Sequence, residues 1–181
     1  MNSIYDKDIF EPIDDDLEKY INRFTMSPAL WSKFSISDLP HVDFLNWKRE
    51  KLIQNGCFSS SLSSIPTQYG GIYIYCIEPG IVPNLGGYVM YIGKATKTTD
   101  ENLRARVKSY AKYISDSETR PRLYRLFHKW GEYVYVHFLP VDSTDEEITA
   151  LEDRLIAAYG KPPCNSDVRI KSVKIAVRAF E

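Results

Sequence analysis

Alternating hydrophobic and polar or aromatic positions predict three β-strands after residue 70. Residues 71–77 and 88–92 are rich in β-branched and aromatic side chains, and a loop with two prolines and three glycines separates them. Residues 133–139 alternate in the same way. These segments predict a small three-stranded antiparallel sheet whose first two strands form a hairpin.

Helical spacing of hydrophobic residues predicts three helices around this sheet. A helix over 100–114 follows Thr98 and Glu101, which have the spacing of a capping box. Its hydrophobic stripe would be Leu103, Val107, Tyr110, Ala111 and Ile114. A second helix would begin at Pro121 and end at Gly131, and a third would cover 145–159.

The N-terminal third also has helical patterns, over 16–24 and 42–54, before a serine-rich linker that ends at Pro66. The tail over 168–177 alternates and predicts a basic edge strand. We therefore expect an α/β fold of the α+β kind in two parts. Residues 1–65 would be a helical extension with a linker, and residues 66–181 the α/β domain.

The two sides of the predicted hairpin differ in chemistry. Ile72 and Ile74 share one face of the first strand, whereas Tyr73 and Tyr75 share the other. If the aliphatic face packs on the core, Tyr73 and Tyr91 lie together on the opposite side of the sheet.

Composition adds the expectation of a packed, cytoplasmic protein that does not enter a membrane. Hydrophobic residues make up 44% of the 181 positions and charged residues 26%, which is typical of globular proteins. No hydrophobic run reaches the ~18 residues of a membrane span, and the first residues are acidic, unlike a secretory signal. The three cysteines are far apart and indicate neither a disulfide framework nor a zinc site.

Charge is unevenly distributed although the net charge is only −1. Residues 1–50 hold more acids than bases, whereas eight basic residues face two acidic residues over 103–130. These eight are Arg104, Arg106, Lys108, Lys112, Arg120, Arg122, Arg125 and Lys129. A basic face is compatible with phosphate binding, but ordinary solvated helix faces explain the same pattern.

Glu152 is the unusual residue of the predicted helix over 145–159. It falls within the hydrophobic arc of the helix, whereas Glu146 and Asp153 point away. A buried carboxylate loses its hydration, so it needs a cation or strong hydrogen-bond donors. Two explanations stay open, namely a buried ion pair with an arginine and a bound metal ion.

Gly71-Ile72-Tyr73 and Tyr91-Ile92-Gly93 resemble the two halves of the GIY-YIG nuclease motif, each on a strand of the predicted hairpin. The resemblance continues through Lys94 and Ala95, as in the Tyr-x-Gly-Lys-Ala form of nucleotide-excision-repair incision subunits. Residues 102–106 resemble the family's Asn-Leu-Arg-x-Arg helix start. The further matches, in family order, are Tyr110, Glu152 and Asn165. The hairpin loop and the path from Gly93 to Arg106 are longer than usual, but both insertions fall in turns.

The resemblance implies a role for each matched position. Glu152 would hold one divalent ion, Mg²⁺ or alternatively Mn²⁺, because a single carboxylate suits a largely hydrated ion. Arg106 would clamp the phosphate with its planar guanidinium group. Tyr73 would be the general base, with its phenolate favoured by Lys94 and the metal.

The remaining matches imply supporting roles. Tyr91 and Tyr110 would orient water or phosphate, and Asn165 would hold the site together. No separate zinc finger or helix-turn-helix segment is recognised in the sequence, so the extension 1–65 and the basic helices over 100–130 would read any DNA sequence themselves. The residues expected to bind DNA are Arg104, Lys108, Arg122 and Arg125.

We therefore expect a divalent-metal-dependent endonuclease that cuts DNA, double-stranded in particular, to 3′-hydroxyl and 5′-phosphate ends. It resembles the stand-alone restriction-type or phage-type members of the family. One active site cuts one strand, so duplex cleavage requires a homodimer or sequential nicking. Two alternatives stay open. One is a non-catalytic nucleic-acid- or protein-binding module with the same fold, and the other is a nuclease that acts on RNA.

Overall fold

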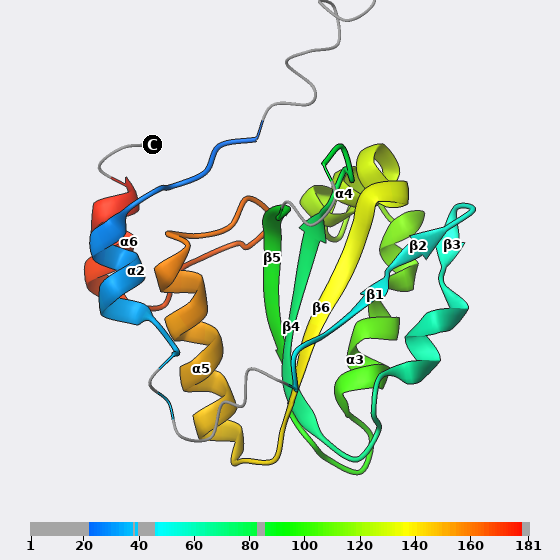
Figure 1. Cartoon of the computed structure of the whole chain (residues 1–181), viewed down its shortest axis with the longest axis horizontal. Coiled ribbons are helices and arrows are strands. Elements are labelled where there is room, and N and C mark those ends of the chain that lie inside the picture. Colours follow the sequence, from blue (N-terminus) through cyan, green and yellow to red (C-terminus); the bar gives the residue numbers. More distant parts are fainter. Residues whose placement is uncertain (1–21, 38, 40–45, 83–85, 179–181) are drawn as a thin grey trace, which may run out of the picture.

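The computed structural model describes residues 22–178 apart from residue 38, residues 40–45 and residues 83–85 (Figure 1). Its centre is an antiparallel sheet of four strands in the order β1-β6-β4-β5. The strands are β1 (Lys48–Lys51), β4 (Gly70–Ile77), β5 (Tyr88–Ala95) and β6 (Val134–Val141). A separate two-stranded hairpin pairs β2 (Ile53–Gln54) with β3 (Cys57–Phe58).

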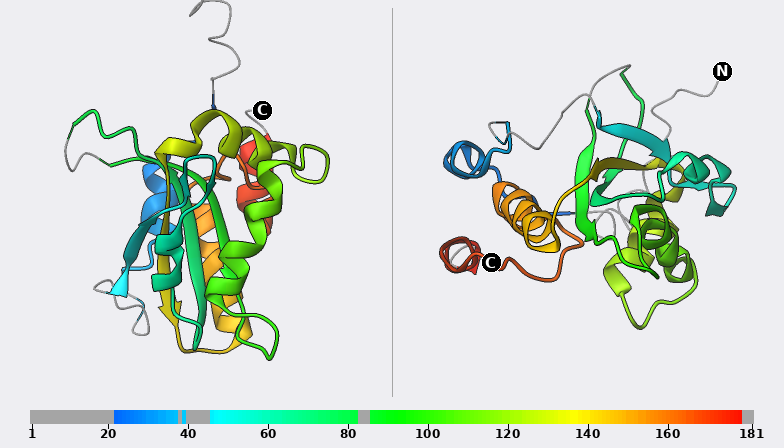
Figure 2. Two further views of the ribbon diagram at one scale, coloured as in Figure 1. Left: turned by 90° about the vertical axis from the view of Figure 1, so that its right-hand side faces the viewer. Right: turned by 90° about the horizontal axis from the view of Figure 1, so that it is seen from below.

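Helices cover both faces of this sheet, so the chain is an α+β protein of three layers (Figures 1 and 2). One outer layer holds α5 (Asp145–Ala158), with α2 (Pro28–Phe34) and α6 (Lys171–Arg178) beyond it. The other layer holds α3 (Leu103–Lys108) and α4 (Pro121–Trp130). Short 3₁₀ turns complete the chain at η2 (Ser60–Ser64), η3 (Ser109–Ile114) and η4 (Gly131–Tyr133). None of the helices in the described part of the chain is long and apolar enough to cross a membrane.

Local sequence signals explain most of these elements. Helix α5 begins with a complete capping box, in which Thr144 and Glu147 each satisfy a backbone N–H of the other. Helix α4 begins at Pro121, whose missing N–H costs nothing at the first helical position, and it buries Leu123, Leu126 and Phe127 as expected. The predicted β4, β5, β6, α4 and α5 are all present.

The expected three-stranded sheet was wrong, and so was the helix expected over 42–54 as far as the described residues 46–54 show; residues 42–45 lie outside the described part of the chain. Lys48–Lys51 forms β1, which pairs with β6 at the edge of the sheet and makes it four-stranded. The polar sequence Lys-Arg-Glu-Lys has good helix propensity, but an edge strand tolerates such residues because one side faces water. Arg49 also stacks on the Tyr135 ring at 3.7 Å. Residues 1–65 therefore contribute a strand to the central sheet rather than forming only a helical extension.

The predicted helix over 100–114 begins later and changes its winding. Thr98 and Glu101 close a turn, and Asn102 provides the N-cap by accepting from the Ala105 N–H at 2.9 Å. From Ser109 the chain winds as a 3₁₀ turn, which has about three residues per turn. Tyr113 is therefore buried together with Tyr110, whereas Ala111 is exposed.

The two chain ends also differ from expectation. The tail expected to form an edge strand over 168–177 contains helix α6, in which Val173 is buried in the hydrophobic core on the α5 side of the sheet. Its spacing of hydrophobic residues fits a helical face as well as a strand, and packing decides between them. The helix expected over 16–24 lies mostly outside the described residues, and Asn22–Phe24 are not helical.

Both faces of the sheet are buried, contrary to the expectation that the tyrosine face lies away from the core. Ile72, Ile74 and Ile92 belong to the hydrophobic core that the sheet shares with α5, and residues of α2 and α6 extend this core. Tyr73 and Tyr75 are fully buried on the other face, beneath α3, η3 and α4. The sheet therefore separates two hydrophobic cores, and the tyrosines belong to one of them.

Candidate active site

A cavity of about 440 Å³ opens beside β5, between the α3 side and the α5 side of the molecule. It brings together residues that are far apart in the sequence. Six of the seven residues predicted to be catalytic line it: Tyr73, Tyr91, Lys94, Arg106, Glu152 and Asn165. The seventh, Tyr110, contacts the tyrosines behind the wall of the cavity. The remaining lining residues are Thr96, Glu101, Arg120, Ile156, Ser166, Asp167 and Arg169.

The glycines of the two strand triplets are explained by close packing. Gly71 has a φ of +141°, and a Cβ there would lie 2.1 Å from the Leu139 carbonyl oxygen of β6. Gly93 is paired with Tyr73 in the β4–β5 register. A Cβ on Gly93 would lie 2.4 Å from the Tyr73 hydroxyl oxygen, so the phenol ring occupies the space above this glycine. The pairing of Gly-Ile-Tyr with Tyr-Ile-Gly therefore leaves space for the Tyr73 ring over Gly93.

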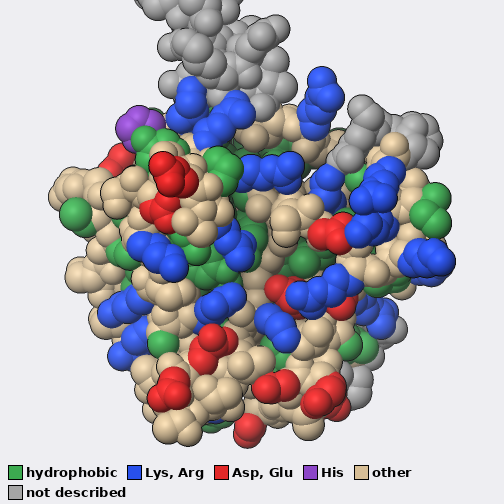
Figure 3. Space-filling model, turned by 180° about the vertical axis from the view of Figure 1, so that it is seen from behind, with side chains coloured by type: hydrophobic (Ala, Val, Ile, Leu, Met, Phe, Trp, Pro, Cys, Tyr) green, Lys and Arg blue, Asp and Glu red, His purple; other side chains and the backbone are tan. Residues whose placement is uncertain are grey.

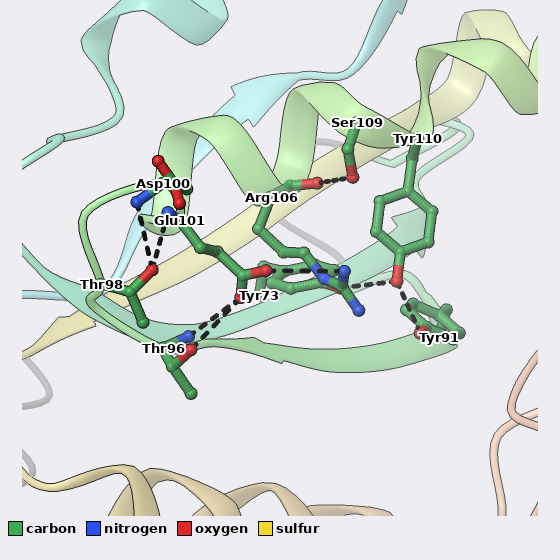
Figure 4. A network of polar contacts seen from close by, with 9 residues as sticks. All are labelled: Tyr73, Tyr91, Thr96, Thr98, Asp100, Glu101, Arg106, Ser109 and Tyr110. Atoms are coloured by element: carbon green, nitrogen blue, oxygen red, sulfur yellow. Dashed lines mark hydrogen bonds and ion pairs between the residues drawn. The ribbon is translucent and has the colours of Figure 1, made fainter.

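Three tyrosine hydroxyls form a continuous hydrogen-bonded chain (Figure 4). The Tyr73 hydroxyl donates to the Tyr110 hydroxyl at 2.8 Å, and the Tyr110 and Tyr91 hydroxyls are 2.9 Å apart. Tyr73 and Tyr91 come from adjacent strands, whereas Tyr110 descends from η3. Burial raises the pKa of Tyr73 well above its ordinary value, and Tyr91 and Tyr110 raise it further. Burial likewise raises the pKa of Tyr91, with Tyr110 adding to the shift.

Arg106 projects from α3 toward these hydroxyls (Figure 4). Its guanidinium lies 5.6 Å from the centre of the Tyr110 ring and 3.8 Å from the Glu101 carboxylate. Burial lowers the pKa of Arg106, but Tyr73 and Tyr110 outweigh this effect and raise it. The Arg106 Nε is buried and has no hydrogen-bond partner among the described residues, so a donor remains for a bound group.

Glu152 reaches the cavity from the face of α5 that packs on the sheet. Its side chain is 10% exposed, and Oε2 lies 3.3 Å from Nη1 of Arg169. Burial raises the pKa of Glu152, while Arg169 and then Lys94 oppose the shift. The expected burial is confirmed, and an arginine does pair with it, as the ion-pair explanation requires. Arg169, however, is 58% exposed and is shared with Asp153 at 3.1 Å.

Lys94 acts on Glu152 rather than on Tyr73. Its ammonium donates to the Thr149 hydroxyl on α5, and its charge favours the ionised form of the Glu152 carboxyl. The largest causes of the raised pKa of Tyr73 are burial and the neighbouring tyrosines, and Lys94 is not among them. The expectation that Lys94 favours the Tyr73 phenolate therefore has no support in this geometry.

Asn165 fastens the loop after α5 to the outer edge of β5. Its side chain accepts from the Ile92 N–H at 2.9 Å and donates to the Ile92 carbonyl at 2.8 Å. The Asn165 carbonyl in turn accepts from Arg122 of α4 at 2.9 Å. The predicted supporting role of Asn165 thus has a direct geometric basis, because Ile92 follows Tyr91 in the strand.

The four residues expected to bind DNA lie outside this cavity. Arg104 donates to the Ile65 carbonyl at 2.6 Å, and Arg122 holds the Asn165 carbonyl. Arg125 lies 5.9 Å from the Trp130 ring, and Lys108 is exposed. Two of the four therefore make contacts that stabilise the fold, and DNA binding by the set remains a prediction.

Two arginines in the cavity were not predicted from the sequence. Arg120 precedes Pro121 at the start of α4 and interacts with the Tyr91 hydroxyl, and Arg169 pairs with Glu152. Arg120 was noted only as one of the basic residues over 103–130, and Arg169 stood in no motif. Folding brings them beside Tyr91 and Glu152.

Within the described residues, no group of three or more His, Cys, Asp or Glu side chains is arranged to hold a metal ion. Glu152 is the buried carboxylate of the cavity, whereas the Glu101 and Asp167 carboxylates in its wall are more exposed, so an ion at Glu152 would be held by this group and by water. No protein-family model, curated protein or solved structure matches the chain. The side chains of the cavity therefore have to carry the functional proposal.

Proposed function

We propose that the chain is a divalent-metal-dependent endonuclease that hydrolyses phosphodiester bonds in DNA and belongs to the GIY-YIG nucleases. One observation carries the proposal. A single cavity gathers a buried carboxylate, three arginines and two members of a hydrogen-bonded tyrosine chain, from six separate segments. Hydrolysis of a phosphodiester needs groups of these kinds to bind the anion, accept a proton and neutralise charge.

The donor set fits a hydrated Mg²⁺ ion. Glu152 offers a carboxylate whose ionised form is costly to bury, and a divalent cation would offset that cost. Mg²⁺ keeps several waters and often uses one or two carboxylates, so a single glutamate in a cavity of about 440 Å³ is compatible with it. When bound, the ion would neutralise negative charge on the phosphate and the leaving oxygen.

The side chains of the cavity would bind the phosphate and transfer the protons. Arg106 binds a non-bridging phosphate oxygen with its guanidinium, and Arg120 stands at the opposite end of the tyrosine chain. A water molecule attacks phosphorus, and its proton passes to the Tyr73 oxygen. The bond from phosphorus to O3′ breaks, and the 3′ oxygen takes up a proton from solvent. The products are a 3′-hydroxyl and a 5′-phosphate.

Tyr73 becomes a base only after giving up its own proton, and Tyr110 is the group that receives its hydrogen bond. Proton movement along Tyr73, Tyr110 and Tyr91 ends at the cavity again, beside Arg120. Arg106 and Arg120 sit at the two ends of this chain and favour negative charge on it. The three phenols would therefore act as one unit.

Nicking of supercoiled plasmid DNA tests the proposal directly. With Mg²⁺ or Mn²⁺ we expect nicked circles to accumulate before linear DNA, because one cavity cuts one strand at a time. EDTA should abolish both products, and end-labelling should detect 3′-hydroxyl and 5′-phosphate ends. Simultaneous appearance of linear DNA would instead indicate a homodimer that cuts both strands, and no metal-dependent cleavage of any nucleic acid would refute the proposal.

A non-catalytic binding module with this fold is the second candidate, and one observation favours it. Arg169 already pairs with Glu152, so the buried carboxylate has a partner without any metal. That module would bind DNA equally well with and without divalent ions and would cleave neither DNA nor RNA. The plasmid assay, repeated with single-stranded RNA, separates these outcomes.

A further inference from the structure

A second cavity, of about 1000 Å³, adjoins the candidate active site. Its walls come from the segment before α2, the start of α4, the loop after α5, and α6. The residues that line it in these segments include Arg23, Phe24, Arg122, Arg125 and Lys161. This cavity contains none of the residues that were expected to be catalytic.

The two cavities share a wall. Met90 lines the larger cavity and Tyr91 the smaller, and the same holds for Cys164 and Asn165. A β-bulge in β5 lies at this point, between the pairs Tyr75–Tyr91 and Cys76–Val89. It turns Met90 onto the same face as Tyr91, where the Met90 carbonyl accepts from the Cys164 N–H at 2.8 Å. A ligand in the larger cavity is thus separated from the tyrosine chain by one layer of residues.

The charges around the larger cavity have a single sign. Four basic side chains line it, Arg23, Arg122, Arg125 and Lys161, and none of the described residues of its wall is acidic. The whole chain has a net charge of −1, so this concentration is local. Figure 3 shows basic side chains spread over the upper part of this side of the molecule, around a furrow. A field of this kind attracts a polyanion.

The same wall also presents flat and polarisable groups. Phe24, Met26, Met90 and Trp130 line the cavity beside the basic residues. Phe24 is 43% exposed and Met26 is 79% exposed, although both are hydrophobic. Aromatic rings next to basic side chains are the combination that single nucleic-acid strands use, since phosphates meet the charges and bases stack on the rings.

We propose that the larger cavity binds the DNA strand next to the phosphate that is cut, with a base against Phe24 and phosphates on Arg23 and Lys161. This inference rests on the proposed nuclease function. Successive phosphates on one strand are only about 3.4 Å apart along the helix axis, so a strand held beside Tyr91 must continue within reach of the adjoining cavity. The segment 22–27 would then set the register of the substrate.

The test measures binding of a fluorescent 20-base single strand and its duplex in EDTA, where no cleavage occurs. The double variant Arg23→Gln/Lys161→Gln removes two charges from the cavity and leaves Arg122, which supports Asn165, in place. The matched control Lys33→Gln/Lys48→Gln removes two exposed lysines from α2 and β1, outside both cavities. Thermal melting establishes that each variant folds, and the single variants replace the double one if it does not.

The cavity variant should bind about tenfold more weakly near 0.1 M salt, and its plot of log affinity against log salt should flatten by about two units. The control should stay within about twofold of the wild type. Phe24→Ala should weaken single-strand binding by roughly five- to tenfold through lost stacking, with the salt slope unchanged.

Equal affinities for the cavity variant and its control would overturn the proposal. A second result would also overturn it, namely that the charge changes weaken single-strand binding but Phe24→Ala does not. Inorganic phosphate or any polyanion would then be a sufficient ligand, and no base would contact Phe24. These failures differ from failure of the nuclease function. A wild type that nicks DNA while the cavity variant binds normally refutes this inference alone, whereas a wild type that never cleaves refutes the function.

Discussion

The Tyr110 hydroxyl lies between the hydroxyls of Tyr73 and Tyr91, and this position determines how a proton would leave the site. Because the Tyr73 hydroxyl donates to Tyr110, its proton is directed along the tyrosine chain. The raised pKa of Tyr73 means that the isolated phenol holds this proton firmly. A base at Tyr73 therefore depends on Arg106, on the bound ion and on the other two phenols.

Tyr73→Phe should lower the single-turnover cleavage rate about 10²–10⁴-fold while DNA binding persists. The base works as the phenolate, and burial raises its pKa well above the ordinary value. The wild-type rate should therefore rise with pH from neutral into the alkaline range without a plateau, and this rise should vanish in Tyr73→Phe. Tyr91→Phe should cost less. A pH dependence that survives without the Tyr73 hydroxyl would assign the base to another group.

Glu152→Gln should raise the melting temperature at pH 7. Burial raises the folded-state pKa of Glu152, so its contribution to stability is fully present below the unfolded pKa of about 4.3 and is lost as pH rises through the folded value. At neutral pH the ionised carboxylate is therefore a net cost, which glutamine removes. The difference between the two proteins should shrink below pH 4. A variant that melts lower at pH 7 would show that the Arg169 ion pair outweighs the cost of burial.

At the scale of elements, the site depends on how a loop is fixed to an edge strand. β5 is the last strand of the sheet, and Asn165 pairs with both backbone groups of Ile92 on its outer edge. Without Asn165, the N–H and carbonyl groups of Ile92 on this edge would have no hydrogen-bond partner. The loop thereby holds Arg169 and Asp167 against the cavity and closes the shared wall.

Asn165→Ala should destabilise the protein by about 1–3 kcal/mol, because the Ile92 N–H and carbonyl lose their partners in a buried setting. Cleavage should fall by at least about tenfold, since Tyr91 is no longer held in place. Chemical denaturation and the plasmid assay measure the two effects. Lys171→Ala, which follows this loop at the start of α6 and is exposed and outside both cavities, is the control and should change neither. If the Asn165→Ala protein is destabilised but fully active, the hydrogen bonds between Asn165 and Ile92 stabilise the fold only and do not support cleavage.

Elements with strong local signals were predictable from the sequence, and elements chosen by packing were not. The β4–β5 hairpin, α4 and α5 have clear periodicity and caps, and all of them form. β1 was missed because Lys-Arg-Glu-Lys becomes a strand only by pairing with β6. The burial of Tyr73 was missed because alternation indicates two faces but not that helices cover both.

The residues of the candidate site likewise fall into those that the sequence indicates and those that only the fold brings to the cavity. Its strand and helix positions follow from motif and periodicity, so the sequence alone indicates Tyr73, Tyr91, Arg106 and Glu152. Arg120 and Arg169 reach the cavity from a helix start and a loop, and they were missed because no motif or periodicity marks them.

At the scale of the whole molecule, the sheet separates two cores, and the cavity lies at the rim where they meet. Glu152 reaches it from one layer, and Arg106 with Tyr110 from the other, so complete folding is required for the site to exist. The central claim is that Glu152 serves a metal ion and the phosphate, rather than only Arg169.

Asp153 makes a matched comparison possible, because it also pairs with Arg169 but does not line the cavity. The decisive measurement is the single-turnover rate at which the wild type, Glu152→Gln and Asp153→Asn cut a labelled DNA duplex in Mg²⁺. We predict that Glu152→Gln loses at least about 10²-fold in rate, while Asp153→Asn stays within about threefold of the wild type. Equal rates for the two variants, or a Glu152→Gln protein that cuts as well as the wild type, would contradict the account.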